Sequence, residues 1–126
     1  MASAFKFSGR LRSFVYAFRG IRLMLASQHN AWVHAAATVA VIVLGAVVRL
    51  STGEWSLIAI AAVGVWTAEA LNTAFEFLCD VASPEFHPMV EKAKDVAAGA
   101  VLLAAIGAVI VGVLIFAPHL AGGRAI

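Results

Sequence analysis

The sequence has few charged residues, few prolines and almost no cysteine. Only 13% of its 126 residues are Asp, Glu, Lys or Arg, which is about half the share found in ordinary soluble domains. Hydrophobic residues make up 63% of the chain, so we expect the lipid bilayer to be its solvent. The single cysteine, Cys79, excludes an internal disulfide and a cysteine-based zinc site.

Several sequence motifs are also missing. No basic run interleaved with aromatic residues is present, so we expect no nucleic-acid partner. The chain contains no GxxxxGKS/T loop, no GxGxxG and no HRD-type motif. Any phosphoryl transfer would therefore use neither the P-loop nor the protein-kinase design.

Three long apolar stretches predict three membrane-spanning helices, over residues of about 31–49, 55–79 and 96–118. A short polar turn at Ser51 to Gly53 separates the first two. A polar stretch over 80–95, with two prolines, is expected to be a loop before the third. We therefore predict an all-α membrane protein with a single domain over residues 1–126. Small residues in the third span favour close helix packing between copies of the chain.

The N-terminal segment is basic and contains no acidic residue. Its apolar residues recur at helical spacing, which predicts an amphipathic interfacial helix over about residues 5–26. Because positive charge near span ends favours the cytoplasmic side, we expect the N-terminus and the 80–95 loop on the cytoplasmic side of the membrane. Gly122 and Gly123 predict a frayed tail. The basic residues of this segment are Lys6, Arg10, Arg12, Arg19 and Arg22.

Two carboxylates interrupt the second apolar stretch, and charged groups inside a span usually mark function. On a helix, Asn72 lies about 60° and Glu76 about 20° around the axis from Glu69, so the three share one face over about 10.5 Å. Asp80 continues this row into the loop. We interpret the row as the wall of a polar groove.

The loop after this row adds carboxylates, a histidine and lysines: Glu85, His87, Lys92, Lys94 and Asp95. Carboxylate oxygens suit magnesium, and lysine suits phosphate oxygens. The residues alone leave alternatives open: a protonated structural Glu69, an ordinary charged flank of a span, a proton-coupled transporter, or a structural membrane oligomer.

Two strings carry a family resemblance: Glu69-Ala-Leu-Asn72-Thr-Ala-Phe-Glu76-Phe-Leu-Cys-Asp80, and Glu85-Phe-His87 continuing through Lys94-Asp95 to Val101. They resemble the signature of the prokaryotic diacylglycerol kinase and undecaprenol kinase family. The resemblance also includes the segment from Ser13 to Arg22. It implies a homotrimer of three-span subunits, with active sites shared between neighbours, that phosphorylates a membrane lipid alcohol using ATP and Mg²⁺.

The resemblance also implies a role for each matching residue. Glu69 would be the catalytic base for the lipid hydroxyl, Asn72 would position the groups around it, and Glu76 would bind magnesium. The segment from Asn30 to His34 resembles the undecaprenol kinase branch more than the diacylglycerol kinase branch. Undecaprenol and diacylglycerol are both membrane alcohols phosphorylated by the same chemistry, so the site residues do not distinguish them. The residues expected to hold ATP and its metal are Tyr16, Glu76, Glu85, His87, Lys94 and Asp95.

Two positions depart from the family pattern. Gln28 stands where much of the family has a second metal-binding glutamate, and it offers the metal only a neutral carbonyl oxygen. Gly9 stands where an arginine is expected, which leaves Arg10 or Arg12 for the contact with the lipid substrate. His34 is interpreted as an interfacial residue rather than a ligand.

Overall fold

The structure is a computed structural model that describes residues 7–122. This part of the chain forms four helices, so it is all-helical as predicted. They are α1 (Phe7–Ser27), α2 (His29–Val48), α3 (Thr52–Ala82) and α4 (Pro88–Leu120). The last three are each long and apolar enough to cross a membrane. Two residues used above, Lys6 and Gly123, lie outside the described residues.

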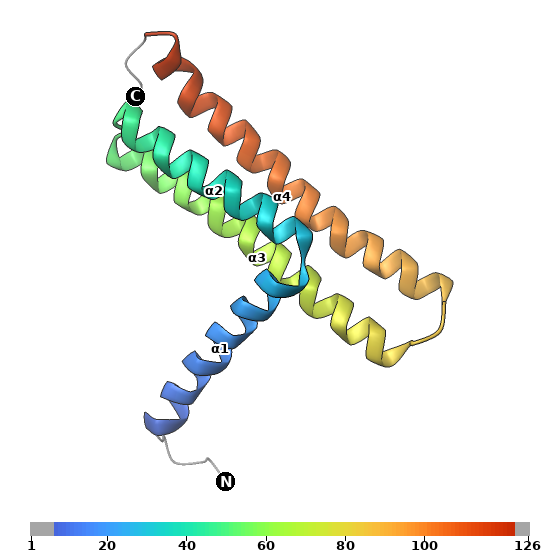
Figure 1. The fold of residues 1–126 in the computed structure, drawn as a ribbon. Coiled ribbons are helices and arrows are strands. Elements are labelled where there is room, and N and C mark those ends of the chain that lie inside the picture. The colour runs from blue at the N-terminus through green and yellow to red at the C-terminus, as the bar shows by residue number, and fades with distance from the viewer. Residues whose placement is uncertain (1–6, 123–126) are drawn as a thin grey trace.

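Helices α2, α3 and α4 form a bundle, and α1 projects away from it at an angle (Figure 1). The strongest packing joins α3 to α4. The shorter α2 lies beside the half of these two helices that is furthest from the loop between them (Figure 1). Met24, near the end of α1, is the buried residue of that helix. The part of α1 before Met24 is therefore available to a membrane surface or to another subunit.

The connection between α2 and α3 is tighter than the sequence predicted. Arg49 adopts a left-handed conformation with φ 57°, which ends α2, and Leu50 then turns into the core. The Ser51 hydroxyl accepts a hydrogen bond from the Glu54 backbone N–H, and the Glu54 carboxylate accepts one from the Ser51 N–H. This reciprocal cap satisfies donors that a helix start leaves unpaired. Helix α3 therefore begins at Thr52, within the predicted turn.

The loop between α3 and α4 is shorter than expected. The polar stretch 80–95 was predicted as a loop, but only residues 83–87 lie between the two helices. Pro88 occupies the first turn of α4, where a missing N–H costs nothing, and the His87 side chain accepts a hydrogen bond from the Met89 N–H. Lys94 and Asp95 consequently lie on a helix.

The tightest packing lies at the end of the bundle remote from that loop. Leu50, Ile58, Ile115 and Phe116 form a buried apolar cluster there. A Cβ atom on Gly45 would lie 2.6 Å from the Trp55 ring, so α2 approaches α3 at a position that only glycine fits. Elsewhere the helices expose large apolar side chains, as expected of surfaces that face lipid or other subunits.

Candidate active site

The polar row predicted on α3 is buried at Glu69 and Asn72 and half-buried at Glu76. Glu69 is 0% exposed and Asn72 is 6% exposed. The Asn72 side-chain amide donates a hydrogen bond of 3.3 Å to Oε1 of Glu76, one turn further along. The Thr73 hydroxyl donates to the Glu69 backbone carbonyl, so that hydroxyl does not compete for the carboxylate. The row therefore presents polar side chains on an interior face of an apolar helix.

The Glu69 carboxylate is unusual because neither of its oxygens has a hydrogen-bond partner among the described residues. Its closest oppositely chargeable group is the Nε2 atom of His34, 3.5 Å from Oε2. A buried carboxylate without hydrogen bonds is costly, and native structures keep such groups mainly where they serve chemistry. Glu69 is therefore available to accept a proton or a hydrogen bond from a ligand.

Gln28 reaches the same row from the break between α1 and α2. Its amide donates a hydrogen bond of 2.7 Å to Oε2 of Glu76, across 48 residues of sequence. Gln28 has an extended backbone at this break, and its own N–H bonds to the Met24 carbonyl. Both Glu76 oxygens are thus held by side-chain amides, from Gln28 on one side and Asn72 on the other.

Lys94 and Asp80 form the next polar contact toward the loop. The Lys94 Nζ atom lies 2.9 Å from Oδ1 of Asp80, joining the second turn of α4 to the last turns of α3. Both side chains are well exposed, at 38% and 66%, so this ion pair adds little stability. Its effect is to hold a cationic group near the row that ends at Glu76.

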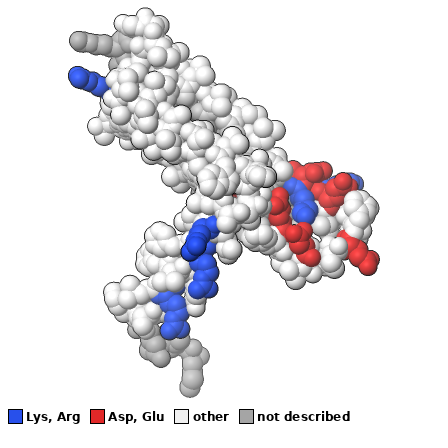
Figure 2. All heavy atoms as spheres, in the orientation of Figure 1, with Lys and Arg blue, Asp and Glu red and all other residues white. Residues whose placement is uncertain are grey.

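The remaining residues expected at the nucleotide are more scattered. Glu85, His87 and Asp95 are exposed around the loop and the start of α4, where acidic groups gather (Figure 2). Tyr16 and Arg10 are exposed on α1, and the Arg19 guanidinium lies 5.6 Å from the centre of the Tyr16 ring. Within a single chain, the nucleotide residues expected on α1 therefore lie apart from those at the loop between α3 and α4.

The chemistry of the row suits a hard cation. Within residues 7–122 no three His, Cys, Asp or Glu side chains cluster as a complete metal site. The Asn72 Oδ1 atom, however, is buried and has no hydrogen-bond partner, and it belongs to the residue that contacts Glu76. Magnesium commonly takes one or two carboxylates and completes its shell with water and substrate phosphates. Glu76 and Asn72 fit that requirement, and Gln28 can add a neutral oxygen by rotating its amide.

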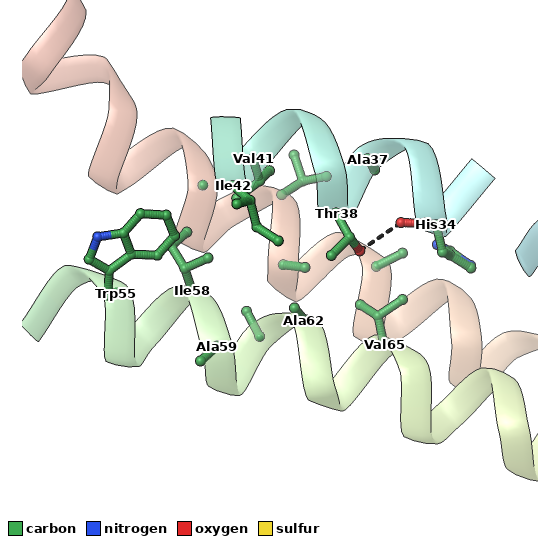
Figure 3. A pocket seen from close by; sticks show the side chains of 15 residues that line it. His34, Ala37, Thr38, Val41, Ile42, Trp55, Ile58, Ala59, Ala62 and Val65 are labelled. Atoms are coloured by element: carbon green, nitrogen blue, oxygen red, sulfur yellow. Dashed lines mark hydrogen bonds between the residues drawn. The ribbon is translucent and has the colours of Figure 1, made fainter. Parts of the chain in front are cut away.

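An apolar pocket of about 410 Å³ lies between α2, α3 and α4. His34 and Trp55 lie toward its two ends (Figure 3). Alanine, valine and isoleucine side chains dominate its lining, and Thr38 adds a hydroxyl next to His34. The pocket therefore offers an apolar environment close to the buried carboxylate of Glu69.

Residues 15–116, well over half of the chain, match the family model described as prokaryotic diacylglycerol kinase. The chain belongs to this family. It is 43% identical over 109 residues to an undecaprenol kinase from Bacillus subtilis, covering 86% of this chain and 89% of that protein. It is 40% identical over 111 residues to a diacylglycerol kinase from Synechocystis sp., covering 87% of this chain and 63% of that protein.

Membership of the prokaryotic diacylglycerol kinase family confirms the resemblance seen in the sequence motifs and makes the chain a lipid kinase. The family match extends from within α1 to residue 116 in the last turns of α4, so it includes the whole polar row. It favours an enzyme over the transporter and structural alternatives.

The structure adds contacts that sequence reasoning missed. His34 was interpreted as an interfacial residue, and its partner was not predicted: its side chain is only 17% exposed and its Nε2 lies 3.5 Å from Oε2 of Glu69. Gln28 was considered only as a metal ligand, whereas here it is a hydrogen-bond donor to Glu76. The one available signal was the presence of polar residues at the start of an apolar stretch, and it does not reveal which partner on another helix each would meet.

Proposed function

We propose that this chain transfers the γ-phosphoryl group of ATP to the hydroxyl of a membrane lipid alcohol, in a magnesium-dependent reaction. The observation that carries the proposal is the Glu69 carboxylate, fully buried in a membrane helix, with neither oxygen hydrogen-bonded to any residue in the range 7–122. Phosphoryl transfer needs positioning and charge neutralisation more than covalent help. A buried base beside a carboxylate–amide pair meets that need.

Each residue of the row has a distinct role in this proposal. Glu69 accepts the proton of the lipid hydroxyl as the hydroxyl oxygen attacks the γ-phosphorus and ADP leaves. Asn72 orients Glu76 through its amide hydrogen bond. Glu76, with Asn72 Oδ1 and Gln28, would hold the magnesium ion. When bound, that ion neutralises charge on the phosphate oxygens.

The nucleotide is held at the loop end of the row. Lys94 supplies a cationic donor for phosphate oxygens, already placed beside Asp80. Asp95, Glu85 and His87 surround the same end of the bundle, where the acidic side chains concentrate (Figure 2). Acidic groups at this end favour the metal complex of ATP over the free polyanion.

The complete site is shared between copies of the chain in a homotrimer. Tyr16 and Arg10 are exposed on α1, which projects from its own bundle (Figure 1). They are proposed to contact nucleotide and lipid, respectively, in an assembled site. Exposed apolar faces on α2, α3 and α4 provide surfaces for such an assembly.

The enzyme is proposed to lie in the bacterial cytoplasmic membrane with the N-terminus and the site inside, where ATP is available. The described basic residues of α1 support this orientation and gather along that helix (Figure 2). Apolar Phe14 and Phe18 are also exposed there, as expected of a helix that lies at the membrane interface.

Undecaprenol is the favoured acceptor. The relative named undecaprenol kinase matches over 89% of its own length, against 63% for the relative named diacylglycerol kinase. The segment from Asn30 to His34 also resembles that branch.

A paired-acceptor assay tests the proposal. Purified protein in mixed micelles with Mg²⁺ and γ-labelled ATP is offered undecaprenol and diacylglycerol in parallel. We expect label in a lipid phosphate, with the higher kcat/KM for undecaprenol. Absence of transfer to both lipids would refute the activity, and a preference for diacylglycerol would refute the acceptor.

A further inference from the structure

His34 and Glu69 face each other from α2 and α3, in the interior of the bundle. Nε2 of His34 lies 3.5 Å from Oε2 of Glu69, and the two side chains are 17% and 1% exposed. Among residues 7–122, no other basic group lies within 4.0 Å of this carboxylate. His34 is thus the described basic side chain at this carboxylate, and its Nε2–H can donate a hydrogen bond to Glu69 after a small movement.

The His34 ring is fixed by its surroundings. Its ring meets the Trp66 ring edge-on, with centroids 6.2 Å apart and an interplanar angle of 70°. The Trp66 Nε1–H donates to the Thr38 hydroxyl, and that hydroxyl donates to the His34 backbone carbonyl. Trp66 and Glu69 are three residues apart and lie on neighbouring positions of one helix face. Trp66 therefore supports the ring that faces Glu69.

His34 also borders the apolar pocket between α2, α3 and α4 (Figure 3). A residue that served only to fill space between apolar helices would not need two ring nitrogens. Polar groups are costly in such a position unless they find partners. The partner that the geometry offers to Nε2 is the Glu69 carboxylate.

We propose that His34 is the positioning residue for Glu69. Its Nε2–H holds the carboxylate in the orientation that accepts the lipid hydroxyl proton. The contact of 3.5 Å exceeds a normal hydrogen bond, and catalytic hydrogen bonds commonly tighten when substrate binds. This inference rests on the proposed function of Glu69 as the base.

Three variants of the full-length enzyme in mixed micelles test this role. H34L removes both ring nitrogens, while H34Q places an amide N–H near the position of Nε2. H29L is the matched control, because His29 is an exposed histidine at the start of the same helix. We expect H34L to lower kcat about 100-fold, a loss typical of a misplaced catalytic group. KM for ATP should stay within about twofold, because His34 does not touch the nucleotide in this proposal.

The conservative variant should restore much of the rate. We expect the kcat of H34Q to remain within about tenfold of the wild-type value. The kcat of H29L should equal the wild-type value. In an E69Q background, H34L should cause no further loss, because a residue that acts only through Glu69 has nothing left to position. If His34 had a merely structural role, H34L would lower kcat by the same factor in the wild-type and E69Q enzymes.

Three outcomes overturn the inference. They are an H34L enzyme with near-normal kcat, an H34Q enzyme no more active than H34L, and a further loss of kcat when H34L is added to E69Q. If H34L does not fold, H34N replaces it, since its shorter amide does not reach the position of Nε2; equal rates for H34N and H34Q then overturn the inference. Lack of transfer by the wild-type enzyme would refute the proposed function itself.

Discussion

Nε2 of His119 lies 3.0 Å from Oε1 of Glu54, which joins the last turn of α4 to the first turn of α3. The two residues are 65 positions apart in the sequence. Their side chains are only 14% and 9% exposed. Glu54 also caps α3 by accepting a hydrogen bond from the Ser51 N–H. One carboxylate therefore both caps α3 and joins it to α4, at the end of the bundle opposite the active site.

Removing the histidine should weaken the bundle without disabling the site. H119L leaves Oε1 of Glu54 without its partner, which costs about 1–3 kcal/mol for a mostly buried polar group. We expect a lower thermal unfolding midpoint in detergent and a kcat close to that of the wild type. S56A is the control, because the exposed Ser56 hydroxyl donates a hydrogen bond to the Thr52 carbonyl of its own helix. Equal midpoints for H119L and S56A would contradict the role of this pair.

Gly45 should tolerate no side chain. A Cβ there would lie 2.6 Å from the Trp55 ring and 2.9 Å from Leu50, so G45A must push α2 away from α3. We expect a loss of about 1–3 kcal/mol in the free energy of unfolding. G64A makes the same chemical change where nothing lies within 4 Å, and should be neutral or slightly stabilising. Equal unfolding free energies for the two variants would rule out this close approach.

Glu69 should be needed for turnover but not for nucleotide binding. E69Q keeps the size of the side chain and removes the base, so we expect kcat to fall by about 10²–10⁴. Equilibrium binding of ATP, measured by calorimetry, should change little. E91Q is the matched control, because Glu91 is exposed in the first turn of α4. A near-normal rate for E69Q would show that another group accepts the proton.

Lys94 should contribute to nucleotide affinity, unlike its neighbour Lys92. Lys94 faces Asp80 at the end of the polar row, whereas Lys92 is exposed on the same helix. Loss of a charged hydrogen bond costs about 1.5–3 kcal/mol, so K94A should raise KM for ATP at least about tenfold. K92A should leave it nearly unchanged. Similar KM values for the two variants would exclude Lys94 from the phosphate site.

A carboxylate at position 28 should strengthen the proposed metal site. Q28E replaces a hydrogen-bond donor to Glu76 with a second anionic oxygen ligand, and magnesium prefers such ligands. We expect the half-saturating Mg²⁺ concentration to fall about tenfold, equal to about 1.4 kcal/mol. Q28A, which removes the amide without adding charge, should not lower it. An unchanged magnesium dependence in Q28E would place the ion elsewhere.

The sequence predicted the all-helical fold and the shared helix face of Glu69, Asn72 and Glu76, because both follow from periodicity along a helix. The sequence also contains two helix-start signals that lie before the predicted starts of the second and third spans. Ser51 and Glu54 have the spacing of a capping box, and Pro88 follows a capping residue. These signals are stronger guides to a helix start than the first apolar residue, which is why α3 and α4 are longer than predicted.

The contacts between helices could not be predicted in the same way. Two of these contacts join different helices, His34 with Glu69 and Glu54 with His119. The third joins Gln28, between α1 and α2, to Glu76 on α3. Such pairs depend on how far one helix slides and rotates against another, and no short-range pattern encodes this offset. Sequence reasoning therefore identified polar residues in apolar surroundings but not their partners.

The hydrogen bond between Gln28 and Glu76 has a thermodynamic consequence. Gln28 is the single residue between α1 and α2, so this bond couples the angle of α1 to the state of the Glu76 carboxylate. A cation that binds Glu76 would displace the Gln28 N–H, so the Gln28 amide would have to rotate to offer the ion its oxygen. By linkage, a membrane surface that favours one angle of α1 through this joint would change the cation affinity by the same factor as the cation changes the binding of α1 to that surface. We therefore expect the magnesium dependence of the enzyme to vary with lipid composition.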